Sequence, residues 1–175
     1  MAAALLTARR MHTLTALPDG RVLAAGGITG GQVWPVPGLT SAEVYDPVSG
    51  AWTPTGAMAV PRHGHSATVL TDGRVLVADG EHVRSAHDNI THASAEIYDP
   101  HTGVRTATAP MAEPRWNHQA VLLHDGRVLV IGAMVSVGRS RSTHLALCEL
   151  YDPSAGVWAP TGTLYAPGSS IRPCV

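Results

Sequence analysis

The stretch RHGHSATVLTDGRVLVADG, residues 62–80, decides the fold of this chain together with SAEIYDP, residues 94–100. Alternating and apolar runs of four to six residues are typical of half-buried and buried strands. Asp72-Gly73 and the segment Asp99–Gly103 supply the residue types that tight turns require. We name the four expected strands A to D: His65–Leu70, Arg74–Ala78, Ser94–Tyr98 and Val104–Thr108. The stretch therefore predicts one small antiparallel sheet.

The same pattern occurs three times at a constant spacing. DGRVL begins at residues 19, 72 and 125, so both steps are 53 residues. EVYDP, EIYDP and ELYDP begin at residues 43, 96 and 149, again 53 apart. Tandem periods near 50 are typical of propeller blades. The repeats expected are about 9–61, 62–114 and 115–167, with 168–175 as a failed or truncated fourth repeat. No segment keeps a period near 3.6, which excludes a helical solenoid.

Composition and charge argue against a nucleic-acid-binding protein and against a membrane-spanning helix. The chain has 175 residues and a net charge of -1, without a basic cluster, so nothing indicates a nucleic-acid partner. No apolar run approaches the roughly 20 residues of a membrane helix. MAAALLTARR places its charges after its apolar stretch, unlike a signal peptide. The compartment therefore stays open, and a secreted longer parent protein is compatible with the sequence.

The repeated motifs resemble the kelch repeat, and more narrowly the bacterial variety related to the central domain of galactose oxidase. RHGHSATVLTDGRVLVADG, SAEIYDP, and the GAW and GVW of the outer copies carry the resemblance. It implies an all-β partial kelch-type β-propeller over residues 1–175, with three four-stranded antiparallel blades. The expected glycine pair is present as Gly26-Gly27, but the other copies have Asp79-Gly80 and Gly132-Ala133. Arg105 replaces the expected tryptophan, which predicts a weaker second blade.

Three blades are fewer than the roughly 4 to 8 of propellers that close. Two explanations are open: the chain is a piece of a longer protein, or two copies join into a six-bladed ring about a twofold axis. We favour the piece, because both ends of the sequence look interrupted. The further blades expected as partners then come from a longer chain, or otherwise from a second copy.

Variation between the repeats is concentrated at one end of the expected blades. The A–B and C–D turns are nearly identical in all copies, whereas the B–C connections, 28–40, 81–93 and 134–146, differ. Variable segments on a repeated scaffold favour a binding face there, next to the D–A links near Arg62 and Trp116. The candidate binding residues are Trp34, His82, His87, Asp88, His92, Trp116, Arg139, Arg141 and His144.

Other residues recur in the repeats and are interpreted as structural. An inter-blade Arg–Glu pair is the expected role of the recurring charges, and the histidines are expected to bond a neighbouring backbone at the start of strand A. The charged and histidine positions are Arg9, Arg62, Arg115, Glu43, Glu96, Glu149, His12, His65 and His118. The aromatic positions are Tyr45, Tyr98, Tyr151, Trp52 and Trp158.

Metal binding and catalysis are not expected. His82, His87 and His92 are chemically suitable ligands, but five-residue spacings in a flexible connection match no known ligand pattern. The galactose oxidase resemblance implies a copper site with a linked Tyr–Cys pair. Here the YDP tyrosines are interpreted as structural, and Cys148 stands where the other repeats have alanine. We therefore expect no catalytic residue, no metal and no cofactor.

The sequence thus predicts a non-catalytic binding module whose ligand is a protein or a glycan. The alternative is a fragment of a secreted, galactose-oxidase-like copper oxidase whose active site is not in this chain.

Overall fold

The computed structural model describes residues 4–30, 38–85, 88–136 and 142–163. Within these ranges the regular elements are strands and none is a helix. The strands are β1 (Thr13–Ala16), β2 (Val22–Ala25), β3 (Ala42–Asp46), β4 (Ala51–Thr55), β5 (Ser66–Val69), β6 (Val75–Ala78), β7 (Glu81–Ser85), β8 (Asp88–Thr91), β9 (Ala95–Tyr98), β10 (Arg105–Thr108), β11 (Gln119–Leu122), β12 (Val128–Ile131), β13 (Met134–Ser136), β14 (Ser142–His144), β15 (Leu147–Asp152) and β16 (Val157–Thr163). None of the described segments is a helix long and apolar enough to cross a bilayer.

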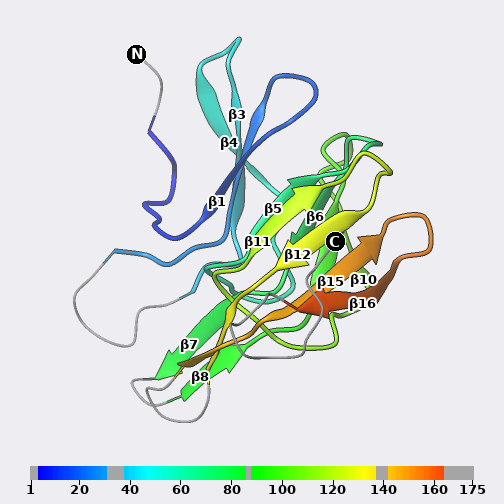
Figure 1. Cartoon of the computed structure of the whole chain (residues 1–175). Coiled ribbons are helices and arrows are strands. Elements are labelled where there is room, and N and C mark those ends of the chain that lie inside the picture. The colour runs from blue at the N-terminus through cyan, green and yellow to red at the C-terminus, as the bar shows by residue number, and fades with distance from the viewer. Residues whose placement is uncertain (1–3, 31–37, 86–87, 137–141, 164–175) are drawn as a thin grey trace.

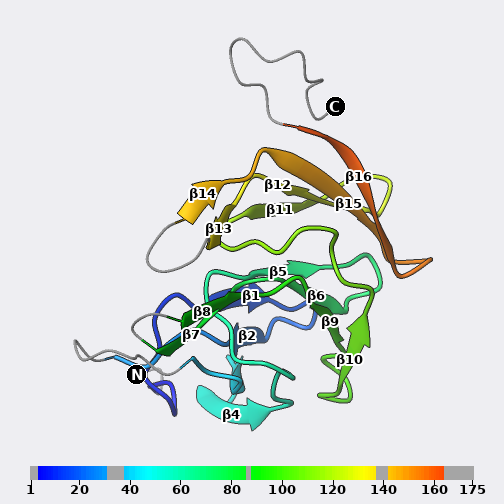
Figure 2. The same ribbon diagram turned by 90° about the horizontal axis from the view of Figure 1, so that it is seen from below.

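Three four-stranded antiparallel sheets form three blades. Blade 1 is β1-β2-β3-β4, blade 2 is β5-β6-β9-β10 and blade 3 is β11-β12-β15-β16, each in the strand order A to D. The A strands are neighbours, because β5 contacts both β1 and β11. Figure 2 shows these three strands one above another. The protein is therefore an all-β partial propeller, and the four strands expected around residues 62–108 are confirmed to within about a residue at their ends.

The short turns explain why each sheet forms with the same register. Gly73 has a φ of 86°, which a glycine adopts without a steric penalty. Asp72 accepts a hydrogen bond from the Arg74 backbone N–H at 3.0 Å and one from Arg74 Nε at 2.8 Å. The turn thus sets Ser66 opposite Ala78 and Val69 opposite Val75. Gly20 and Gly126 have φ values of 86° and 85° in the equivalent turns.

The hydrophobic core lies between the blades. One cluster joins blade 1 to blade 2, and a second joins blade 2 to blade 3. The first contains Leu17, Leu23, Ala25, Ala42, Val44, Met58, Val75, Val77 and Tyr98. The second contains Leu70, Leu76, Ala78, Ala95, Ile97, Met111, Val128, Val130 and Tyr151. Each interface therefore uses equivalent residues of successive repeats.

Buried Arg–Glu pairs connect the D–A link to strand C within one blade. Arg62 donates to Glu96 at 3.1 Å, to the Ser94 carbonyl at 3.0 Å and to the Asp79 carbonyl at 2.7 Å. Glu96 also accepts from the Ala59 backbone N–H. The equivalent pairs are Arg9–Glu43 and Arg115–Glu149. The expectation of an inter-blade pair was wrong, because the arginine precedes strand A of the same blade whose strand C carries the glutamate.

Histidine and tyrosine side chains bridge adjacent blades instead. His65 and Thr13 Oγ1 are 3.1 Å apart, and His118 and Ser66 Oγ are 2.8 Å apart. The histidines therefore bond a side-chain hydroxyl of the preceding blade, not its backbone. Tyr98 bonds Thr55 of the preceding blade at 2.8 Å, and Tyr151 bonds Thr108 at 2.6 Å.

Arg105 takes over two contacts of the tryptophan that it replaces. Its guanidinium lies 4.7 Å from the Tyr98 ring centroid, much as Trp158 lies 4.9 Å from Tyr151. Arg105 Nε donates to the Gly56 carbonyl at 2.7 Å, and Trp158 Nε1 makes the equivalent bond. The terminal nitrogens of Arg105 are buried without a hydrogen-bond partner among the described residues. The expected weakness of blade 2 stays a prediction, now tied to those two nitrogens.

Candidate functional site

The B–C connections of blades 2 and 3 are short hairpins that lie at the end opposite the A–B and C–D turns (Figure 1). β7 pairs with β8 and β13 pairs with β14. The connection at 81–93, which the sequence suggested to be a loop, is therefore a paired hairpin over its described part. Paired backbone groups in these hairpins hold the side chains of this end in defined positions.

In each repeat, one residue of the D–A link pairs with the start of the B–C connection. The bridges are Arg10 with Ile28, His63 with Glu81, and Trp116 with Met134. The link residues are thus equivalent in backbone position but are a cation, an imidazole and an indole. Arg10 is exposed, Trp116 is half-buried and His63 is buried. We call Arg10, His63 and Trp116 the link triad. Identical backbone placement with three different chemistries is typical of a recognition surface on a repeated scaffold.

A buried polar cluster fixes the hairpins of blades 2 and 3 against each other. The Ser136 hydroxyl donates to Glu81, and the Ser136 backbone N–H donates to Thr91 Oγ1 at 3.2 Å. Glu81 Oε2 lies 3.7 Å from His63 Nε2. The His63 ring is tilted against the Trp116 ring, with centroids 6.4 Å apart. Because the cluster joins β7, β8 and β13, this part of the face is organised before a ligand arrives.

Two histidines of this end, His63 and His92, have pKa values below the ordinary value of 6.5. Burial lowers the pKa of His63, and the neighbouring His82 lowers it further. Burial, followed by the charge of Arg62, lowers the pKa of His92 to about 4. The His92 ring nitrogen Nε2 donates to the Pro61 carbonyl at 3.2 Å. His92 therefore connects the end of strand β8 to the D–A link through this hydrogen bond, and its ring is not free to bind a ligand.

The structure brings together only part of the predicted binding set. His82, His92 and Trp116 lie at the hairpin end, and His144 is exposed in β14. His82 approaches the first connection closely, since a Cβ added to Gly38 would lie 2.9 Å from its Nδ1. Trp34, His87, Arg139 and Arg141 lie outside the described residues, as does the side chain of Asp88. Their role in binding stays a prediction.

No metal-binding arrangement is found in the part of the chain that the structure describes. There, no group of three or more His, Cys, Asp and Glu side chains could hold a metal ion. His63, His65, His92 and His118 take part instead in the contacts given above.

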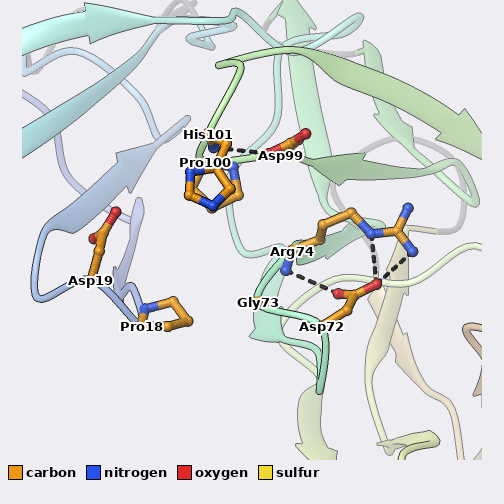
Figure 3. A pocket seen from close by; sticks show the side chains of 8 residues that line it. All are labelled: Pro18, Asp19, Asp72, Gly73, Arg74, Asp99, Pro100 and His101. Carbon is orange, nitrogen blue, oxygen red and sulfur yellow. Dashed lines mark hydrogen bonds and ion pairs between the residues drawn. The ribbon is translucent and has the colours of Figure 1, made fainter.

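A shallow depression lies at the opposite, turn end, between blades 1 and 2. It has a volume of about 140 Å³ and is lined by Pro18, Asp19, Asp72, Gly73, Arg74, Asp99, Pro100 and His101. Figure 3 shows Asp72 bonded to Arg74, and Asp99 bonded to the His101 backbone. Each of these carboxylates already stabilises its own turn. The charges are therefore satisfied locally, and nothing in the depression converges on a ligand.

Comparison with known proteins agrees with this geometry. Residues 9–59 match the family model described as the Kelch motif. The three blades form a partial kelch-type propeller. An F-box/kelch-repeat protein of Arabidopsis thaliana is 30% identical to the chain over 147 residues, 80% of this chain and 35% of the relative. The spermatocyte protein spe-26 of Caenorhabditis elegans is 27% identical over 155 residues, 87% of this chain and 25% of the relative.

The chain spans about a third or less of the length of these curated relatives. The match supports the kelch-repeat family. The narrower likeness to the galactose oxidase domain stays a prediction.

Sequence reasoning missed the buried cluster around Glu81. A signal was available, because Glu81 stands at the repeat position occupied by Ile28 and Met134. A carboxylate between two apolar equivalents, with His63 at the facing link position, marks a place where one blade departs from the shared structural pattern. Ser136 gave no such signal, since its contact with Glu81 joins two different repeats.

Proposed function

We propose that this kelch propeller is a non-catalytic protein-interaction module, and that its partner binds the hairpin end. The observation that carries the proposal is the link triad: one backbone position is occupied by Arg10, His63 and Trp116 in three successive repeats, and of these Arg10 is exposed and Trp116 is half-buried. A tryptophan and an arginine are common anchors of protein interfaces. The kelch-repeat relatives agree with an interaction role.

The hairpin end is also the better organised of the two ends. Ser136 and Glu81 join neighbouring hairpins, so less side-chain entropy is lost when a partner docks. At the turn end the charged residues are repeated copies that support their own turns. Recognition by the hairpin end therefore explains where the repeats differ as well as where they agree.

A bait experiment with matched variants tests the proposal. The purified chain retains its partners from an extract of its source, and the bound proteins are compared among wild type, Arg10→Ala, Trp116→Ala and the turn-end control Arg74→Ala. Arg10 is exposed, so its replacement leaves the core intact. We expect one partner set that Arg74→Ala retains and that the two link variants lose.

The affinity of each variant for a purified partner then measures how much the substitution weakens binding. Trp116→Ala is expected to weaken binding by about 30-fold or more, corresponding to the roughly 2 kcal/mol or more of an interface anchor. Denaturant midpoints of the free variants exclude unfolding as the cause. The proposal fails if Arg74→Ala alone abolishes binding, or if a glycan array and not a protein supplies the specific ligand.

A further inference from the structure

The buried carboxylates that the structure describes are paired with arginine, with one exception. Five such carboxylates are at most 4% exposed. Four of them lie 3.7 Å or less from an arginine nitrogen, namely Glu43, Asp79, Glu96 and Glu149. The fifth is Glu81, whose one basic neighbour among the described residues is His63, with Nε2 3.7 Å from Oε2. That distance is too long for a hydrogen bond.

His63 does not supply the missing positive charge. Burial lowers the pKa of His63 from the ordinary value of 6.5, and the neighbouring His82 lowers it further, so most of the imidazole is uncharged at pH 7. The Ser136 hydroxyl donates to Oε1 of Glu81, whereas Oε2 has no hydrogen bond from a described residue. A buried carboxylate without a cation is costly to the fold. One oxygen of Glu81 is therefore open to a cation from outside the chain.

An aromatic surface adjoins this carboxylate. The half-buried Trp116 ring lies against His63, with ring centroids 6.4 Å apart. Its backbone pairs with Met134, two residues before Ser136. Gly64 leaves room for the indole, because a Cβ added there would lie 3.4 Å from Trp116 Cε3. Indole faces attract cations. Blades 2 and 3 thus bring a carboxylate, a hydroxyl and an indole together where their hairpins meet.

We propose that a lysine side chain of the protein partner enters between the β7–β8 and β13–β14 hairpins, pairs with Oε2 of Glu81 and packs its methylene stem against Trp116. This inference rests on the proposed function and names the group that the hairpin end recognises. An arginine fits less well, because its planar guanidinium favours two free carboxylate oxygens and Ser136 holds one of them. A compact ammonium on a slender stem needs only one oxygen.

The stability of the free protein gives the first test. Glu81→Gln keeps the shape of the side chain and its acceptor for Ser136 but removes the charge. Because it removes an uncompensated buried charge, we expect its urea midpoint at pH 7 to be at or above that of wild type. Glu96→Gln is the matched control, and its midpoint is expected to fall because Arg62 loses its carboxylate. A midpoint that falls equally in both variants overturns the proposal, since Glu81 would then have a cation in the free protein.

Lysine chemistry in the partner gives the second test. The chain contains no lysine, so lysine reagents act on the partner's side chains. Proteins of the extract are acetylated, which removes the lysine charge, or guanidinated, which keeps it, and their binding to wild type and Glu81→Gln is measured. We expect acetylation to weaken binding at least about 30-fold for wild type and less than about 3-fold for Glu81→Gln. Guanidination is expected to weaken binding to wild type less than acetylation does.

The matched variants separate this inference from the proposed function. If Arg74→Ala releases the bound proteins and Trp116→Ala does not, the proposed function fails and the lysine contact fails with it. If Trp116→Ala releases them but acetylation weakens wild type and Glu81→Gln equally, only the lysine contact is overturned. Acetylated proteins that still bind wild type but not Glu81→Gln would assign the contact to an arginine, which also overturns the choice of lysine.

Discussion

Asp79 should make the stability of the protein fall as the pH rises from about 5 to 8. It stands where blades 1 and 3 have Gly26 and Gly132, with a left-handed φ of 57°. The side chain is 0% exposed, and neither carboxyl oxygen has a hydrogen-bond partner among the described residues. Arg115 Nε is 3.7 Å away, but Arg115 also pairs with Glu149. Burial raises the pKa of Asp79 to about 8, against the opposing charge of Arg115.

The size of the change in the free energy of unfolding follows from that pKa and the ordinary carboxyl value of 3.8. Between these two values the folded protein holds a proton that the unfolded chain has released. The free energy of unfolding therefore falls by about 1.4 kcal/mol for each pH unit in that window. At pH 7 the carboxyl destabilises the fold by about 4 kcal/mol relative to a group that does not titrate.

The assay is urea denaturation at pH 5, 6, 7 and 8, followed by tryptophan fluorescence at one protein concentration. Wild type is compared with Asp79→Asn, which keeps the side-chain volume, tolerates positive φ and does not titrate. We expect the difference in stability between the two proteins to change by about 3 kcal/mol from pH 5 to 7, in favour of Asp79→Asn. Comparing how the free energy of unfolding changes with pH in the two proteins removes any effect of the substitution that does not depend on pH.

Two comparisons make the test specific. Burial lowers the pKa of His65 and His118, and these groups raise stability with pH equally in both proteins. Asp72→Asn is the control carboxyl, because its hydrogen bond to Arg74 lowers the pKa of Asp72 and confines its effect to acid pH. Equal pH dependence of wild type and Asp79→Asn would refute the reasoning, and would show that Arg115 keeps Asp79 ionised in the folded state.

Three further changes test the contacts within and between blades. Glu96→Ala leaves Arg62 buried without its carboxylate, and is expected to reduce the free energy of unfolding by about 3 to 5 kcal/mol in urea denaturation; a loss under about 1 kcal/mol contradicts the structural role. Arg105→Trp removes two buried, unpartnered nitrogens and is expected to raise stability by about 1 to 3 kcal/mol, so a lower thermal midpoint counts against the reading. Tyr151→Phe deletes the hydrogen bond to Thr108 and is expected to reduce the free energy of unfolding by about 1 kcal/mol. An unchanged thermal midpoint would show that this inter-blade bond adds nothing to the stability.

The strands and turns were predictable because their causes are local. Asp72-Gly73 forces a tight turn, and the residues on each side alternate or run apolar over lengths that only strands use. The hairpins β7–β8 and β13–β14 were not predictable in the same way. Their sequences are polar and differ between repeats, and their pairing depends on the D–A links against which they form bridges.

By itself the sequence determined the blade, its four strands, its number of copies and the end at which the copies differ, because a 53-residue repeat imposes the same local physics three times. Only the tertiary structure decided how repeated residues pair. Arg62 and Glu96 are 34 positions apart and could pair within a blade or between blades, and the packing of the D–A link over strand C selects the first. It also placed Glu81 against Ser136, residues 55 positions apart in different repeats, because side-chain contacts across blades depend on how two sheets sit together and leave no period in the sequence.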